Sequence, residues 1–478
     1  MYKYKKTGSL LWAIMLTCCT SACVTSKYKT PALDLPDTYR TDSASVDSNL
    51  SDSGIATIPY HDFFTDTILL KLIDSSVTRN YNLQIALKQI AYAQQAFKQA
   101  KWGNVPTVSL TAGQASITRS SDNSLNGLTT TTFLGQSYIE DYNSNFSISW
   151  EADIWGKIKS RKDAALASYL QSKEAVKAVK TKLVSDVTQG YYNLLMLDAQ
   201  LDITKKSISL FDSSIRVTTF LRDAGNVTTL AVDQLEAAKE QAIASLPLLE
   251  QQLLAQENAL SFLTGQNPQK IERTATLSSM QLHAQLPVGI PVNMVSQRPD
   301  IRESEMTLMQ AHAMVNVARA SLYPTLSISG QGGVNAFEAS NWFKIPGSLF
   351  GLASGSLVQP ILQNKRLQTQ YQQSKIAREQ AELQFKQSVL SALIEVSNAL
   401  SQIDKLKNQE LHISKQVAFL EQAVKNSGLL YNNGDATYLD VLTAQINKLQ
   451  ADLNLASLQR QRLSAEVILY QSLGGGWK

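Results

Sequence analysis

Residues Asn82–Leu110 read NLQIALKQIAYAQQAFKQAKWGNVPTVSL, and residues Asp300–Ile328 read DIRESEMTLMQAHAMVNVARASLYPTLSI. Each stretch begins as a helical pattern rich in Ala and Gln and then changes to the alternating pattern of a β-strand. The change passes through an aromatic residue and a proline, which are Trp102 and Pro106 in the first stretch and Tyr323 and Pro324 in the second. A unit that changes from helical to strand period twice indicates an internal duplication. We therefore predict two repeats, residues 63–270 and 271–478.

The same periodicities predict a mainly helical chain with a small β part. Strand patterns cover Thr107–Thr118, Asn145–Trp155, Thr325–Val334 and, less clearly, Ser348–Leu362, and residues 120–143 form a polar loop. Helical patterns cover about 63–102, 157–220, a continuation to Leu263, 365–429 and 438–473. These helices are much longer than the mean of about 12 residues in globular proteins. Gly225 and Gly434 mark breaks between consecutive long helices in the two repeats.

The first residues have the features of an export signal. Three lysines precede a short apolar run, Leu10–Thr17, which is followed by small residues and Cys23. We predict a signal peptide over residues 1–22, and an acylated Cys23 at the start of an extended tether, residues 23–62. The alternatives are an ordinary signal peptide or a core cysteine.

Composition excludes several functional classes. All three cysteines lie in the first 23 residues, so an acylated mature chain has no thiol left for disulfides. The formal charge of +4 includes three signal lysines, and the remaining balance gives no support for nucleic-acid binding. Beyond the signal, no apolar run is long enough for a membrane-spanning helix.

The last helical pattern has two apolar seams rather than one apolar face. One seam runs through Leu439, Leu442, Ile446, Leu449, Leu453, Ala456, Leu463, Val467 and Tyr470, and the other through Val441, Ala444, Ala451, Leu455, Leu458, Ala465 and Leu469. Two polar strips separate the seams. The first has Asp440, Thr443, Asn447, Gln450, Asn454, Ser457, Gln461 and Ser464, and the second has Gln445, Asp452, Gln459 and Glu466. We expect this helix to pack against a neighbouring helix along each seam and to face water along each polar strip. This favours a helix in the wall of a hollow cylinder over a helix in an ordinary bundle.

The strands have one apolar and one polar face. Phe146, Ile148 and Trp150 alternate with Ser147, Ser149 and Glu151. A barrel in lipid must close and needs at least eight strands, so one chain with four strands is insufficient and several chains together are required. We expect the interfacial aromatic residues to be Phe146, Trp150, Trp155, Tyr323 and Phe350. The alternative is a soluble α+β protein with two hairpins.

Several motifs in order along the chain resemble the TolC-like outer-membrane factor family, in particular its lipoprotein branch that serves multidrug efflux pumps. The motifs are Tyr28–Pro31, Trp150–Lys157, Gln297–Ile301, Ala318–Pro324, Tyr431–Gly434 and Glu466–Trp477. The resemblance implies a homotrimer in which a 12-stranded transmembrane β-barrel continues into a periplasmic α-barrel of coiled-coil helices. Lys365-Arg366 departs from the paired glycines and basic residue that the family has at the turn after the fourth strand.

The resemblance also assigns site residues. The helix breaks correspond to the periplasmic tip that meets an adaptor, and Gly225, Leu230, Gly434 and Asp435 are the expected adaptor-contact residues. Leu439, Asp440, Thr443 and Tyr431 are the expected constriction residues. For Asp440 the alternative is an acid that stabilises its helix start, and for Tyr431 simple packing. In the first repeat, the position that corresponds to Asp440 is Ala231, which has no charge. We therefore expect a threefold gate built mainly by the second repeat.

No pattern of an enzyme is present. The four histidines are scattered without ligand spacing, and no phosphate-binding loop follows a strand. We predict no cofactor and no metal. The expected function is a passive outer-membrane duct for drugs or other small solutes, lipid-anchored, opened by a periplasmic adaptor and served by an inner-membrane pump. The alternatives are a channel for protein secretion and a periplasmic coiled-coil scaffold that does not conduct.

Overall fold

The computed structural model describes residues 25–33, 35–36, 38–40, 55–280 and 291–478. The predicted signal peptide and the predicted acylation of Cys23 lie outside these residues. The chain divides into two compact units. Unit 1 contains residues 1–31, 92–170 and 306–383, and unit 2 contains residues 32–91, 171–305 and 384–478. This division cuts across both sequence repeats, so each repeat contributes to both units.

The helices repeat with nearly equal lengths, which agrees with the duplication seen in the sequence. The first long pair, α6 and α7, has 67 and 35 residues, and the second pair, α10 and α11, has 68 and 35 residues. The bounds of the main helices are α3 Thr67–Arg79, α4 Tyr81–Lys101, α5 Leu125–Leu134, α6 Lys157–Asp223, α7 Thr229–Leu263, α9 Pro299–Ala320, α10 Arg366–Asn433 and α11 Tyr438–Ser472. Short helices are α2 Tyr60–Phe63 and α8 Pro291–Gln297. Among the described helices, none is both long and apolar enough to cross a membrane.

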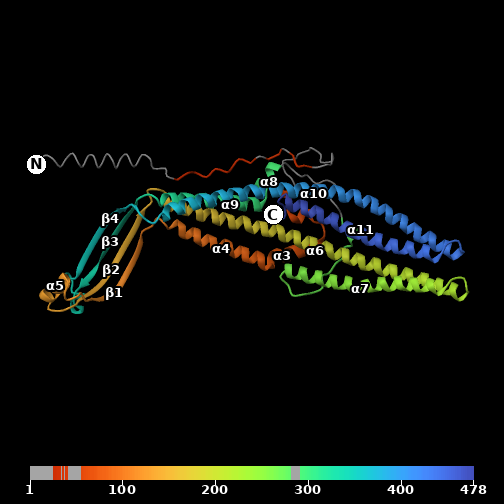
Figure 1. Cartoon of the computed structure of the whole chain (residues 1–478), viewed down its shortest axis with the longest axis horizontal. Helices are drawn as coiled ribbons and strands as arrows, with labels where there is room; N and C mark the ends of the chain where they lie inside the picture. The colour runs from red at the N-terminus through yellow and green to blue at the C-terminus, as the bar shows by residue number, and fades with distance from the viewer. Residues whose placement is uncertain (1–24, 34, 37, 41–54, 281–290) are drawn as a thin grey trace. The chain divides into compact units, whose positions relative to one another are not determined.

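Unit 1 contains a four-stranded antiparallel sheet in the order β1-β2-β3-β4 (Figure 1). The strands are β1 Thr107–Thr118, β2 Ile139–Ala152, β3 Thr325–Ala336 and β4 Leu349–Val358. The central pairing, β2 with β3, joins the two sequence repeats. Strands β1 and β4 each pair with one neighbour, so both are edge strands of the sheet.

The two faces of the sheet differ as the alternation predicted. On the polar face, hydroxyl groups pair across neighbouring strands at 2.8 Å, in the pairs Ser109–Ser147, Ser327–Ser356 and Ser329–Ser354. On the other face, the side chains of Val108, Phe146 and Leu357 are between 62% and 67% exposed. Water suits the first face, whereas the second presents exposed apolar side chains of the kind that a hydrophobic surrounding would cover.

Unit 2 is held together by helix packing and by an aromatic group near the end of the chain. Phe211, Leu235 and Leu442 form a buried cluster between α6, α7 and α11. Tyr470, from α11, stacks on Phe63 with ring centroids 4.2 Å apart, and its hydroxyl donates to the Ile58 carbonyl at 2.5 Å. The last turn of α11 is thereby joined to the residues that precede α3.

Three expectations about secondary structure need correction. The helical pattern over 63–102 is interrupted, because the Asp66 carboxylate accepts from the Ile68 and Leu69 amides and starts α3 anew. A second interruption falls at Asn80, whose side-chain amide donates to the Leu263 carbonyl at 2.9 Å. The polar loop 120–143 contains helix α5, which begins where the Ser124 hydroxyl accepts from the Gly127 amide. The last residues of this loop belong to β2, which begins at Ile139 rather than at Asn145.

The expected tether is extended but attached to the protein where the structure describes it. In unit 1, the Ser26 carbonyl accepts from the Asn316 side chain, and His312 Nε2 lies 2.9 Å from the same oxygen. In unit 2, the Ser397 hydroxyl donates to the Arg40 carbonyl at 2.8 Å. Each unit therefore binds part of this segment through specific polar contacts.

Candidate functional site

The turns between the long helices have the same construction in both repeats. Gly225 and Gly434 have φ values of +77° and +84°, and a Cβ added at either position would meet no heavy atom of the described residues within 4 Å. The Asn226 amide donates to the Leu221 carbonyl and the Asp435 amide to the Leu430 carbonyl, both at 2.9 Å. Glycine suits these positions because the left-handed backbone favours a residue without Cβ.

The leucine that follows each turn has an exposed side chain. Leu230 and Leu439 are 56% and 52% exposed, whereas the nearby valines, Val232 and Val441, are buried. An exposed leucine on a rigid turn can contact an equivalent leucine of another copy. The arrangement is compatible with the expected constriction at Leu439 and shows the same exposure for Leu230.

Asp440 takes part in a capping box at the start of α11. Its Oδ2 accepts from the Thr437 amide at 2.9 Å and from the Thr437 hydroxyl at 2.7 Å. These two hydrogen bonds from Thr437 hold the pKa of the Asp440 carboxyl below its usual range. A depressed pKa means that this stabilisation is present near neutral pH and is lost as the pH falls through the folded-state pKa. The structure therefore supports the helix-start interpretation of Asp440 directly.

The first repeat lacks this capping box. Thr228 precedes α7 without a side-chain capping bond, and Ala231, which aligns with Asp440, is fully buried. Asp440 and Thr443, by contrast, are exposed. The two turns are thus alike in backbone and different in charge, as the sequence indicated.

Tyr431, near the end of α10, links the second repeat to α6 of the first repeat. Its hydroxyl donates to Thr218 Oγ1 at 3.1 Å, and both side chains are buried. The Gln445 side chain donates to the Ser214 hydroxyl at 2.8 Å, so α10 and α11 are both joined to α6. The second polar strip of α11, expected to face water, is therefore partly buried, since Gln445 and Glu466 are 6% and 7% exposed.

Replacing Tyr431 with Phe is expected to lower the free energy of unfolding by about 1 kcal/mol. The substitution keeps the ring but leaves the buried Thr218 hydroxyl without this donor. Chemical denaturation followed by circular dichroism measures the change. Tyr81→Phe is the control, because the Tyr81 side chain is 64% exposed. Equal effects of the two substitutions would show that the Tyr431 bond contributes nothing.

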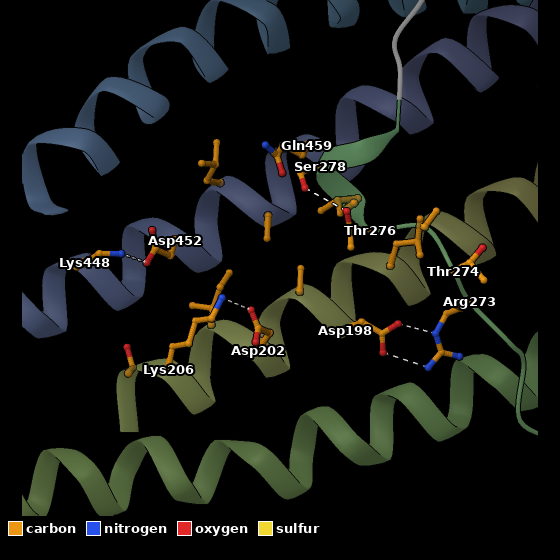
Figure 2. Close-up of a pocket in the computed structure, with 18 of the residues that line it drawn as sticks. Asp198, Asp202, Lys206, Arg273, Thr274, Thr276, Ser278, Lys448, Asp452 and Gln459 are labelled. Atoms are coloured by element: carbon orange, nitrogen blue, oxygen red, sulfur yellow. Dashed lines mark hydrogen bonds and ion pairs between the residues drawn. The ribbon is translucent and has the colours of Figure 1, made fainter. Parts of the chain in front are cut away.

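A polar cavity of about 970 Å³ lies in unit 2 between α6, α11 and residues 270–278 (Figure 2). Arg273 reaches across to Asp198, with its Nε and Nη2 donating to the two carboxylate oxygens at 2.5 and 3.1 Å. Its Nη1 donates to Glu257 Oε1 at 2.6 Å. Lys448 and Asp452 pair on the opposite wall at 2.6 Å. The charged side chains named here therefore form ion pairs with one another. The described residues contain no group of three or more side chains that could hold a metal ion.

Arg298, from the motif Gln297–Ile301, lies at a helix start and also joins three helices. It precedes α9 as expected, and its side chain is only 8% exposed. Its guanidinium donates to Asp300, Glu395 and the Ser472 carbonyl, which joins α9, α10 and the end of α11. Asn80 holds the same offset in the first repeat, and its side chain donates to a carbonyl at the end of α7. Asn80 was not singled out from the sequence; the constant offset between the repeats is the signal that could have found it.

The expected interfacial aromatic residues fall into three positions. Trp155 and Tyr323 stack with ring centroids 4.9 Å apart where the helices meet the strands, and Trp150 Nε1 donates to the Asn104 carbonyl. Phe146 is 62% exposed on the apolar face. Phe350 pairs through Gly333 with Asn145 and so lies on the polar face, away from Phe146. Glycines and serines leave the alternation of β4 weak, so the sequence did not show which face Phe350 occupies. The interfacial role of these aromatic residues stays a prediction.

The comparisons with known proteins agree over nearly the whole chain. A family model described as outer membrane efflux protein matches residues 72–266 and 290–475. The cation efflux system protein CusC of Escherichia coli O6:H1 is 26% identical over 470 residues, which cover 98% of this chain and 97% of CusC. The pyoverdine export outer membrane protein OpmQ of Pseudomonas putida is 30% identical over 337 residues, covering 70% of this chain and 71% of OpmQ.

Solved structures confirm the fold expected from the sequence. A crystal structure of CusC superimposes with a TM-score of 0.82 at 25% identity, covering 95% of this chain and 99% of CusC. The mainly helical architecture with four strands per chain, predicted from periodicity, is thereby confirmed, and so is the resemblance to the family.

Proposed function

Because this chain belongs to the outer membrane efflux protein family, we propose that three copies of it form the outer-membrane exit duct of a tripartite efflux pump. The observation that carries this proposal is the four-stranded sheet, which has two unpaired edges, one apolar face and one hydroxyl-lined face. An open edge in lipid leaves backbone groups unsatisfied. Three such sheets close a 12-stranded barrel with the serine pairs towards the lumen.

The long helices continue the duct on the periplasmic side. In the first polar strip of α11, Asp440, Thr443, Asn447, Gln450 and Asn454 are exposed, as a lumen-facing strip requires. Towards the end of α11 the same strip is covered, since Ser457 and Gln461 are half-buried and Ser464 is buried. The neighbouring seams hold buried residues such as Leu442, Ala451 and Leu458. Apolar flanks against other helices and a wet strip between them support a hollow α-barrel over a solid bundle.

The proposal also includes partners and a membrane anchor, which rest on the family membership and on the sequence. The turns at Gly225 and Gly434 are the contact points of a periplasmic adaptor, and Leu439 with Asp440 forms the constriction. An inner-membrane pump supplies the energy, since passage through a passive duct requires no bound nucleotide. Acyl chains on Cys23 hold the N-terminus at the membrane. A mature chain whose mass corresponds to an N-terminus other than an acylated Cys23 would refute the anchor.

The cargo is drugs or other small solutes selected by the pump. CusC belongs by name to a cation efflux system, whereas OpmQ exports pyoverdine, and both resemble this chain to a similar degree. Similar ducts thus serve chemically different cargo. A passive lumen without a stereospecific pocket accounts for this tolerance.

Planar-bilayer conductance of the purified protein tests the duct. We expect a low conductance for the wild type and a large increase for Leu439→Ser/Asp440→Ala, because the double substitution removes the apolar contact and the carboxylate from the tip. Leu230→Ser is the matched control, since Leu230 has nearly the same exposure in the first repeat. A protein that never conducts, even as the double variant, is a scaffold and not a duct. Equal opening by Leu230→Ser would refute a gate built mainly by the second repeat.

A further inference from the structure

Three of the four segments that join helices to strands in unit 1 are strongly basic, and the fourth has one basic residue, Arg319. The pairings Thr107–Ser149, Ala152–Leu326 and Thr325–Val358 bring all four to the same end of the sheet. They are residues 98–106, 153–163, 319–324 and 359–366, with basic residues Lys98, Lys101, Lys157, Lys159, Arg161, Lys162, Arg319, Lys365 and Arg366 against two acids, Asp153 and Asp163. The loops at the other end, residues 119–138 and 337–348, hold two basic and two acidic residues.

This excess does not follow from the overall composition. The whole chain has a formal charge of only +4, so the residues outside these segments are acidic in balance. Seven of the nine basic side chains are exposed, all except Lys157 and Arg319. One of the acids is engaged locally, because the Asp153 carboxylate accepts from the Ile158 and Lys159 amides at 2.8 Å and starts α6.

Exposed apolar side chains lie in the same segments as the basic residues. Trp102 is 70% exposed, and Ile361 and Leu362 are 86% and 93% exposed. Lys101 Nζ lies 4.6 Å from the ring centroid of Phe97, so one of the cations already sits over an aromatic face. A solvated helix end accounts for the charges and not for exposed Trp, Ile and Leu beside them. Aromatic and aliphatic groups mixed with Lys and Arg are the composition of a membrane–water interface.

We propose that this basic collar, defined as Lys98, Lys101, Lys159, Arg161, Lys162, Lys365 and Arg366, binds the phosphate headgroups of anionic phospholipids in the periplasmic leaflet. The inference rests on the proposed function, which places the sheet in the outer membrane. Long, flexible cations spread over three segments at one end of the sheet suit a headgroup surface, whereas a single bound anion requires convergent donors. Asn364 and Lys365 form the turn from β4 into α10, with φ values of +49° and +61°.

Lipid selectivity of the purified full-length protein tests the collar. Tryptophan quenching by brominated phosphatidylglycerol is compared with quenching by brominated phosphatidylcholine, at low and high salt. We expect the wild type to prefer phosphatidylglycerol by about tenfold or more at low salt, with the preference reduced at high salt. Lys98→Gln/Lys101→Gln/Lys159→Gln/Lys162→Gln is expected to abolish most of this preference.

The matched control removes four exposed lysines from unit 2, as Lys88→Gln/Lys407→Gln/Lys415→Gln/Lys425→Gln, and should keep the preference. The collar is refuted if both variants behave alike or if the wild type shows no preference. It is also refuted if excess inorganic phosphate removes the preference at constant ionic strength, since the cations then bind a free anion. Conductance in phosphatidylcholine bilayers separates the two proposals, because a collar variant that conducts normally leaves the duct intact.

Discussion

Replacing Arg273 with Met is expected to lower the free energy of unfolding by about 3–5 kcal/mol. The Arg273 side chain is 10% exposed and bridges Asp198 on α6 to Glu257 on α7, whose side chain is 5% exposed. Without the guanidinium, Glu257 remains as a buried charge that has lost its strongest partner. Guanidinium chloride denaturation in detergent, followed by helical circular dichroism, measures the shift.

Two further variants show whether burial is the cause. Lys206→Met removes an ion pair with Asp202 in which the side chains are 74% and 61% exposed, and should cost less than about 1 kcal/mol. Arg273→Met/Glu257→Met removes both charges and should recover much of the loss. An equal cost for Arg273→Met and Lys206→Met would contradict the argument from burial.

Replacing Gly265 with Ala is expected to cost roughly 2–5 kcal/mol, because two penalties coincide. Gly265 ends α7 with φ +64°, a backbone conformation that disfavours a Cβ. A Cβ at this position would also lie 2.5 Å from the Arg79 carbonyl oxygen, which is backbone and cannot rotate away. The same denaturation experiment measures the effect.

Gly225→Ala is the matched control for Gly265→Ala. Gly225 has φ +77°, but an added Cβ would meet no described atom within 4 Å, so only the backbone penalty of about 1–2 kcal/mol applies. The difference between the two variants isolates the close approach to Arg79. If both cost the same, the packing of the α7 end against Arg79 is looser than the structure shows.

Much of the fold was predictable because its signals are local. The change from helical to strand period at Pro106 and Pro324 located β1 and β3, and the alternation through Phe146 and Trp150 identified the apolar face. Gly225 and Gly434 marked the turns because left-handed backbone favours glycine. Local composition failed where it was ambiguous. The residues after β1 are polar, so α5 was not predicted. Strand β4 is rich in Gly and Ser, so its sequence did not show on which face of the sheet Phe350 lies.

The pairing of charges and buried polar groups depends on segments far apart in the chain. Arg273 meets Asp198 across 75 residues, Tyr431 meets Thr218 across 213, and Gln445 meets Ser214 across 231. No periodicity within one helix predicts such contacts, and the polar strip at Gln445 was expected in water for that reason. The basic collar likewise appears only when the strands bring three separate segments to one end of the sheet.

The sequence by itself determined the duplication, the long helices, the four strands and the turns, because periodicity and glycine chemistry act over a few residues. The tertiary structure decided which polar side chains are buried, which carboxylates belong to Arg273 and Arg298, and where basic residues gather. Burial, ion pairing and the clustering of basic residues depend on contacts between segments far apart in the chain. The free energy of a buried charge is set by its neighbours in space rather than in sequence.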